Sequence, residues 1–175
     1  MFGIIAVKNS KNAGEKMKTK VVDTREYVSV LKELVNEGRT VSLLIAGNSM
    51  SPFLVHERDY IFFKKPEKPL KKGDMVFFQR VTGEYVMHRI YRVKNKEYYI
   101  VGDAQTVIEG PVKEEQIFAK IISAKRKNRQ IGPGNFWWEF FEHFWINVIP
   151  MRKTFISIYS FCKKLVYRGH ETITH

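Results

Sequence analysis

The spacing of apolar residues predicts one helix near the N-terminal end of the folded part. Its apolar positions recur at i, i+3 and i+4 intervals, as on one face of a helix. These positions are Val28, Leu31, Leu34 and Val35. Asp23 and Glu26 stand three residues apart, as in a capping box, and Gly38 offers a C-terminal stop. The pattern therefore predicts a helix that begins at residue 23 or 24 and packs on a core.

From Thr40 to Lys125 the pattern changes to short apolar runs that are separated by turn residues. The expected strands cover residues 41–46, 59–64, 74–80, 85–92, 97–102 and 116–124. Breaks are expected at residues 65–66, 72–73, 82–83, 94–95 and 109–111, where Gly, Pro or Asn occur. The sequence therefore predicts a mainly β protein with a meandering antiparallel sheet.

An aromatic segment follows the glycine-rich break at residues 132–134. Residues 136–149 contain all three tryptophans, and the polar residues of this segment form a single helical stripe. The stripe consists of Glu139, Glu142, His143 and Asn147. Pro150 ends this predicted amphipathic helix, and a second apolar piece covers residues 154–167. Neither piece has the roughly 20 apolar residues that cross a bilayer. Residues 136–168 therefore suit either an anionic membrane surface or packing against the β domain.

These patterns divide the chain into three parts. Residues 1–22 form an N-terminal arm, residues 23–128 the β domain, and residues 133–175 an aromatic and basic extension. The apolar run at residues 1–7 is too short for a transmembrane helix, and its charges have the wrong order for a signal peptide. No membrane anchor or signal peptide is recognised, so we expect a cytoplasmic or peripherally membrane-associated protein.

The net charge of +12 is concentrated at the C-terminal end. Residues 1–46 carry 8 basic and 5 acidic groups, residues 47–119 carry 12 and 10, and residues 120–175 carry 10 and 3. A basic segment binds nucleic acid or anionic membrane, and the aromatic residues here favour membrane, so we expect no nucleic-acid partner. Cys162 is the only cysteine, which excludes an intrachain disulfide and a cysteine metal cluster. No metal or cofactor is expected.

Candidate chemistry begins with Gly47-Asn48-Ser49-Met50-Ser51-Pro52, which follows the apolar run at residues 41–46. A serine in a loop at the end of a strand is a common position for a nucleophile. Taken alone, however, this hexapeptide also fits an ordinary turn, because Gly, Asn, Ser and Pro are turn residues. Further motifs are needed to choose between these interpretations.

Three such motifs follow downstream, with sequences KGDMVFF at residues 72–78, VMHRI at residues 86–90 and VGDA at residues 101–104. Together with the serine motif, their order and spacing resemble the S24/S26 peptidase superfamily, which includes type I signal peptidases and LexA-type repressors. The resemblance covers roughly residues 40–122. It implies an antiparallel β fold and a serine peptidase, which agrees with the strand pattern.

The resemblance implies a role for three residues. Ser49 matches the nucleophile, and His88 matches the base of the histidine-type members in the endoplasmic reticulum and archaea. A histidine with an ordinary pKa near 6.5 suits this role. Asp103 matches the acid that would orient His88. Asp74 is the weaker candidate for that acid and fits a simple turn carboxylate.

The backbone N–H of Ser49 is the expected oxyanion donor. Some relatives add a hydroxyl two residues before the nucleophile, where this chain has Gly47. The chain also departs from the family at Ala104-Gln105, where asparagines are common, and at Ala119, where glycine is common.

The function implied by this resemblance is a serine endopeptidase that cleaves leader or signal peptides after small residues such as alanine. Its partner would be a peptide or preprotein substrate. The alternative is a catalytically silent peptide-binding or membrane-surface module of the same fold. A nucleic-acid-binding regulator of the LexA type is disfavoured, because residues 1–46 offer one convincing helix, too few for a helix-turn-helix.

Overall fold

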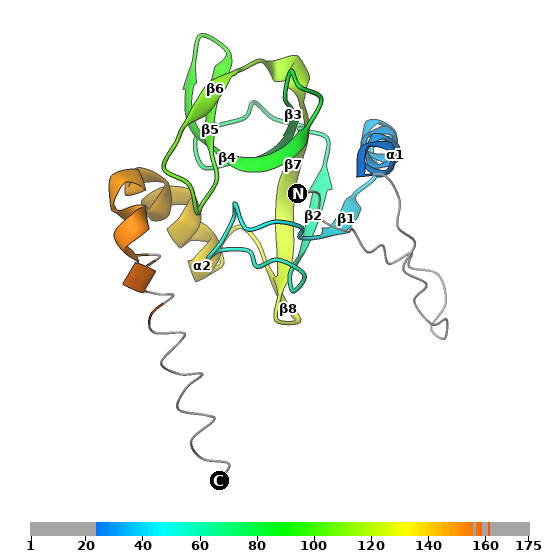
Figure 1. The fold of residues 1–175 in the computed structure, drawn as a ribbon. Coiled ribbons are helices and arrows are strands. Elements are labelled where there is room, and N and C mark those ends of the chain that lie inside the picture. Colours follow the sequence, from blue (N-terminus) through cyan, green and yellow to red (C-terminus); the bar gives the residue numbers. More distant parts are fainter. Residues whose placement is uncertain (1–23, 156, 159–160, 162–175) are drawn as a thin grey trace.

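The computed structural model describes residues 24–155, 157–158 and 161, and the predicted arm at residues 1–22 lies outside this range. One antiparallel sheet of eight strands organises the described chain (Figure 1). The strands are β1 (Val41–Leu44), β2 (Tyr60–Lys64), β3 (Met75–Gln79), β4 (Tyr85–Lys94), β5 (Glu97–Val101), β6 (Glu109–Val112), β7 (Ile117–Arg126) and β8 (Arg129–Ile131). Their order is β1-β2-β7-β3-β4-β5-β6, and β8 pairs with β7.

The predicted mainly β fold is confirmed, and the six expected strands agree with the structure within two residues at each end. Two strands were not predicted. β6 contains the Gly110-Pro111 pair that suggested a break, but it lies at the edge of the sheet, where proline is tolerated. β8 forms a hairpin with β7 through Lys127 and Asn128, both of which have positive φ angles.

Helix α1 (Thr24–Asn36) confirms the predicted N-terminal helix, and Gly38 follows it with a φ angle of 80°. The helix lies beside β1 at one edge of the sheet (Figure 1). Val28, Leu31 and Val35 are buried in the larger of two main cores, together with residues of β1, β2 and β7. A second core fills the curled part of the sheet between β3, β4, β5 and β6.

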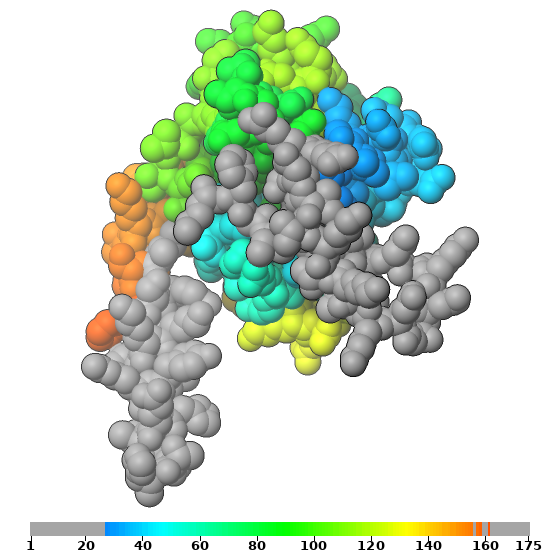
Figure 2. Space-filling model, turned by 45° about the vertical axis from the view of Figure 1, so that its right-hand side comes forward, coloured from blue at the N-terminus to red at the C-terminus, as the bar shows by residue number. Residues whose placement is uncertain are grey.

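The C-terminal segment packs against the larger core as a series of short helical turns. These are α2 (Phe136–Glu139), the π-helical η2 (Phe140–Phe144), and the 3-10 turns η3 (Trp145–Asn147) and η4 (Ile149–Met151), with η1 (Glu114–Gln116) standing apart before β7. The continuous helix expected over residues 136–149 is therefore subdivided. Trp138, Phe141 and Trp145 are buried in the core that contains Phe53. Figure 2 shows the orange C-terminal turns directly against the body of the domain.

The same turns also expose aromatic residues. Phe136 is 70% exposed, Trp137 52% and Phe144 55%. One face of the segment is therefore packed, as the protein-packing alternative expected, while the other face remains accessible. None of the helices in the described residues combines the length and apolar character that a bilayer crossing requires.

Candidate active site

Ser49 lies in the loop that follows β1. Gly47 opens the loop with a φ angle of 91°, and its N–H donates to Nδ1 of His56 at 3.0 Å. Met50 and Phe53 anchor the other side of the loop in the larger core. Between these anchors, Ser49 is partly exposed, and its hydroxyl bonds to no described residue. This is the environment that a nucleophile requires: a fixed backbone with an unengaged side chain.

Gly102 brings the Ser49 backbone to the end of β5. The carbonyl oxygen of Ser49 accepts a 2.8 Å hydrogen bond from the N–H of Ala104. A Cβ atom on Gly102 would lie 2.6 Å from the same oxygen, closer than real Cβ contacts allow. Gly102 is therefore required by this close approach, and a side chain there would push the nucleophile loop away.

The strand register shows from which side of the sheet His88 projects. Arg89 of β4 pairs with Val101, the last residue of β5, so continuing this register by one residue sets His88 opposite Gly102. Directly opposite residues of an antiparallel pair project from the same face. The missing Gly102 side chain would point at Ser49, so the side chain of His88 projects toward that same region. On this register the side chain of His88 faces the region of the Ser49 loop, and no hydrogen bond joins the two described side chains. Their catalytic pairing stays a prediction.

His88 is buried and carries an unpaired ring nitrogen. Its ring lies 6.1 Å from that of Phe78, and it is 1% exposed. Its Nδ1 is buried without a hydrogen-bond partner. Burial lowers the pKa of His88 to about 4, with the cation of Arg80 contributing in the same direction. The imidazole is therefore neutral at pH 7, although it is a weaker base than an ordinary histidine.

Glu109 is the carboxylate whose charge acts on His88. It pairs with Ile100, which pairs with Ile90, two residues beyond His88 in β4, so Glu109 and His88 share one face of the sheet. Its charge raises the pKa of His88 and so opposes the effect of burial. Arg80 holds this carboxylate through two hydrogen bonds of 2.7 and 2.6 Å, which lower the pKa of Glu109.

Asp103 has a different partner from the one predicted. Its two carboxylate oxygens accept hydrogen bonds from Nε and Nη2 of Arg89 at 3.1 and 3.0 Å, and both side chains are almost fully buried. Since Arg89 follows His88 directly in β4, its side chain projects from the opposite face. The structure therefore does not bring Asp103 to His88, and the acid on the His88 face is Glu109.

Asp74, the weaker candidate, supports a turn. One of its oxygens accepts from the N–H of Lys71 at 3.0 Å, and the other lies 2.7 Å from Nζ of Lys120. The interpretation as a turn carboxylate fits these contacts. In the same region, Nη1 of Arg89 donates to the carbonyl of Gly73 at 2.8 Å, which ties the turn to the Arg89–Asp103 pair.

The oxyanion prediction concerns the N–H of Ser49. Within the described ranges this N–H has no hydrogen-bond acceptor, whereas the following loop donors, Ser51 and Leu54, bond to Asn48 and Met50. An unengaged N–H at the nucleophile remains available to a developing oxyanion. Its role stays a prediction.

Sequence reasoning missed Glu109, Arg80 and His56. Glu109 was interpreted as part of a break, because the Gly-Pro pair that follows it resembles a turn. Only the pairing of β6 with β5 shows which face it occupies. Arg80 was available as a cation at the end of an expected strand, but its partner lies 29 residues away. No local pattern could have joined the two.

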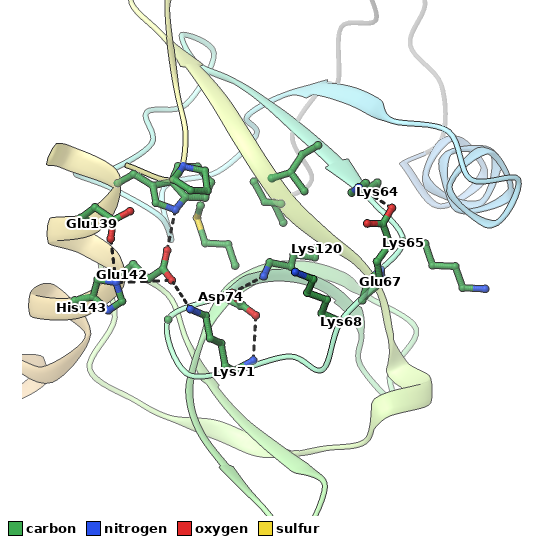
Figure 3. Close-up of a pocket in the computed structure, with 17 residues that line it drawn as sticks. Lys64, Lys65, Glu67, Lys68, Lys71, Asp74, Lys120, Glu139, Glu142 and His143 are labelled. Atoms are coloured by element: carbon green, nitrogen blue, oxygen red, sulfur yellow. Dashed lines mark hydrogen bonds and ion pairs between the residues drawn. The ribbon is translucent and has the colours of Figure 1, made fainter. Parts of the chain in front are cut away.

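A separate hollow of about 360 Å³ lies where the C-terminal turns meet the turns around β2 and β3 (Figure 3). Glu142 approaches both Lys71, at 3.6 Å, and Nε1 of Trp138, at 2.8 Å. A Cβ on Gly73 would lie 2.6 Å from the side chain of Glu142, so the segment is closely fitted here. Among the residues that the structure describes, no cluster of three or more His, Cys, Asp or Glu could hold a metal ion.

Residues 6–122 match the family model described as Peptidase S24-like. The chain belongs to this family. The match to the S24-like family covers the nucleophile loop, His88 and Glu109, and it ends within β7. No curated protein and no solved structure matches the chain. The C-terminal turns of this S24-like protein thus lie beyond the matched region.

Proposed function

We propose that this S24-like protein is a serine endopeptidase that cleaves leader or signal peptides. The observation that supports this best is the register that sets His88 opposite Gly102, which lies against the Ser49 backbone, with Glu109 on the same face of the sheet as His88. An unengaged hydroxyl, a neutral imidazole and a carboxylate are the three groups of serine nucleophilic catalysis.

In the proposed reaction, the hydroxyl oxygen of Ser49 attacks the scissile carbonyl while its proton passes to His88. The backbone N–H of Ser49 donates to the oxyanion. His88 then gives the proton to the leaving amine, and the peptide bond breaks to leave an acyl ester on Ser49. A water molecule, deprotonated by His88, hydrolyses the ester. Nδ1 of His88 is buried without a partner, so the proposal assigns this proton transfer to Nε2.

The second candidate, a silent module of the same fold, is favoured by one observation. His88 has a low pKa and its Nδ1 is unpaired, while Arg80 engages the nearby carboxylate. Such an imidazole accepts a proton poorly. The endopeptidase is the better supported candidate, because apo sites commonly align their hydrogen bonds only when substrate binds.

A substrate series tests the endopeptidase. Purified protein is expected to cut a leader-type peptide with alanine before the scissile bond, because the family resemblance implies a preference for small residues. Replacing that alanine with leucine should lower kcat/KM by roughly 10- to 200-fold, the range for a misfit in an apolar pocket. Mass spectrometry of the products identifies the bond. If no peptide in the series is cut, the silent module is the better description.

We further propose that the exposed aromatic face of residues 136–155 meets an anionic membrane surface. Phe136, Trp137 and Phe144 are exposed there, and Arg126 lines a hollow of about 280 Å³ with Trp137. Arg152, the basic neighbour of Lys153 in the sequence, is buried and cannot reach lipid. The proposed surface therefore relies on Lys153 and the basic residues of the β7–β8 hairpin.

The double substitution Trp137→Ser and Phe144→Ser is expected to weaken binding to anionic vesicles at least about tenfold, because interfacial binding scales with buried apolar area. Both side chains are exposed, so the fold should survive. Co-sedimentation measures the change, and zwitterionic vesicles and high salt are the controls. Equal binding of the double variant and the parent would contradict the membrane proposal.

A further inference from the structure

The loop at residues 102–105 is held by side chains from the C-terminal turns. Nη1 of Arg152 donates to the carbonyls of Gly102 and Gln105, at 2.8 and 3.0 Å. The indole N–H of Trp145 donates to the carbonyl of Asp103 at 2.9 Å. Three of the four carbonyls in this loop are therefore bound by residues 145 and 152, which lie beyond the residues that match the family model.

The same loop is hydrogen-bonded to the backbone of Ser49, the proposed nucleophile. The N–H of Ala104 donates to the carbonyl of Ser49. Gly102 lies so close to that oxygen that a Cβ atom on residue 102 would be only 2.6 Å from it. Asp103 lies between them with its carboxylate fixed by Arg89. A displacement of the loop would therefore move the backbone of Ser49 directly. Asp103 itself lies on the face opposite His88, so it does not act on His88 in this way.

Arg152 is an unusual residue for this position because it is a fully buried cation. It is 0% exposed, and burial lowers the pKa of its guanidinium. Its Nη2 donates to the carbonyl of Trp145 at 3.0 Å, and the guanidinium lies 5.7 Å from the centre of the Trp145 ring. The carboxylate of Asp103 is already engaged by Arg89, so Arg152 serves mainly as a donor to carbonyls. Burying a cation is costly, and its carbonyl contacts together with the nearby charge of Asp103 offset that cost.

We infer that Trp145 and Arg152 are positioning residues for Ser49, acting through the loop at residues 102–105. This inference rests on the proposed endopeptidase function. The two residues touch neither Ser49 nor His88. They fix three loop carbonyls, and the loop in turn fixes the nucleophile backbone through the N–H of Ala104. In this proposal, a segment outside the family match holds the Ser49 loop of the S24-like sheet in place.

Trp138 provides a matched control. Trp138 and Trp145 are buried in the same core, and each indole N–H makes one hydrogen bond. The Trp138 bond goes to Glu142 within the C-terminal turns, at the hollow of Figure 3, and the Trp145 bond goes to the loop. Trp138→Phe and Trp145→Phe therefore remove comparable packing and one hydrogen bond, but only the second releases the loop.

The experiment compares both variants, and Arg152→Gln, with the full-length parent. Trp145→Phe should lower kcat at least about tenfold with KM within about twofold, because a displacement near 1 Å can cost about a hundredfold in rate. Trp138→Phe should keep kcat within about twofold. Hydrogen exchange of the Ala104 amide, measured by NMR, should be at least about tenfold faster in Trp145→Phe than in Trp138→Phe.

Each outcome decides between the alternatives. Equal kcat and equal exchange in the two tryptophan variants would overturn the inference, as would faster exchange in Trp145→Phe without a loss of kcat. If the parent cuts no peptide, the proposed function fails, and the Ala104 exchange rates still decide whether Trp145 holds the loop. Should Arg152→Gln fail to fold, the tryptophan pair still gives the answer.

Discussion

Ser49→Ala is expected to abolish peptide cleavage, with kcat lowered roughly 10⁴-fold or more, since loss of a serine nucleophile leaves only the contributions of binding and the oxyanion hole. The fold should be unaffected. The Ser49 hydroxyl bonds to no described residue, and its backbone contacts with Ala104 do not depend on the side chain. The free energy of unfolding should therefore change by no more than about 0.5 kcal/mol.

Ser51→Ala is the matched control for this experiment. Ser51 lies in the same loop, and its backbone N–H bonds to Asn48, an interaction that alanine keeps. It should retain the parental rate. Initial rates on the alanine-containing peptide, with thermal unfolding of each variant, measure both quantities. If Ser49→Ala cleaves the peptide at the parental rate, Ser49 is not the nucleophile. If Ser51→Ala loses activity instead, Ser51 is the nucleophile.

The pH dependence of kcat/KM should report the pKa of His88, which the charges of Arg80 and Glu109 modify. A base works only when deprotonated, so kcat/KM should rise with pH through the pKa of His88 in the free enzyme. Burial lowers that pKa to about 4, so the rise should lie far below the 6.5 of an ordinary histidine. His88→Ala should lose activity roughly 10⁴-fold, while Lys94→Ala, on the exposed end of the same strand, should not.

Arg80→Met should move the inflection to higher pH. The Arg80 cation lowers the pKa of His88 directly, and it also engages the Glu109 carboxylate that raises it. Without Arg80, the cation no longer lowers the pKa of His88, while the carboxylate of Glu109 still raises it. Glu109→Gln should act in the opposite direction, lowering the pKa further and reducing kcat by roughly 10²- to 10⁴-fold, because the imidazolium loses its stabilising charge.

Asp103→Asn separates the two candidate acids. The buried Arg89 would lose its ionic partner, which typically costs about 3–5 kcal/mol of stability. The inflection of the pH profile should stay where it is in the parent. NMR titration of the His88 ring gives the pKa in each variant independently of turnover. An unchanged His88 pKa in Glu109→Gln, with a large shift in Asp103→Asn, would restore Asp103 as the acid.

The strands could be predicted because alternating apolar residues record which side chains face the core. Phe63 and Ile61 in β2, for example, point inward at every second position. The same logic could not find β6, since its pairing depends on β5 and its proline resembles a turn signal. It also could not foresee the division of residues 136–151, where the apolar side chains follow the shape of the core more closely than the period of one helix.

The site was predictable as far as its motifs are local. Ser49 and His88 each lie in a motif of their own, and the register sets His88 opposite Gly102, which lies against the Ser49 backbone. The acid was not predictable in that way, because strand pairing supplies it. The His88-Arg89 pair did contain a usable signal. Neighbouring residues in a strand face opposite sides, so a buried Arg89 needs its own carboxylate, and Asp103 is the one that meets it.

The contacts of Trp145 and Arg152 also bear on how the protein matures on the ribosome. Synthesis is vectorial, so the nucleophile loop, His88 and all eight strands emerge before residue 145 does. A nascent chain could form the sheet while the carbonyls of Gly102, Asp103 and Gln105 still bond to water. We therefore expect proteolytic competence to be acquired late, when the last turns dock, so that a partly synthesised chain is folded but inert.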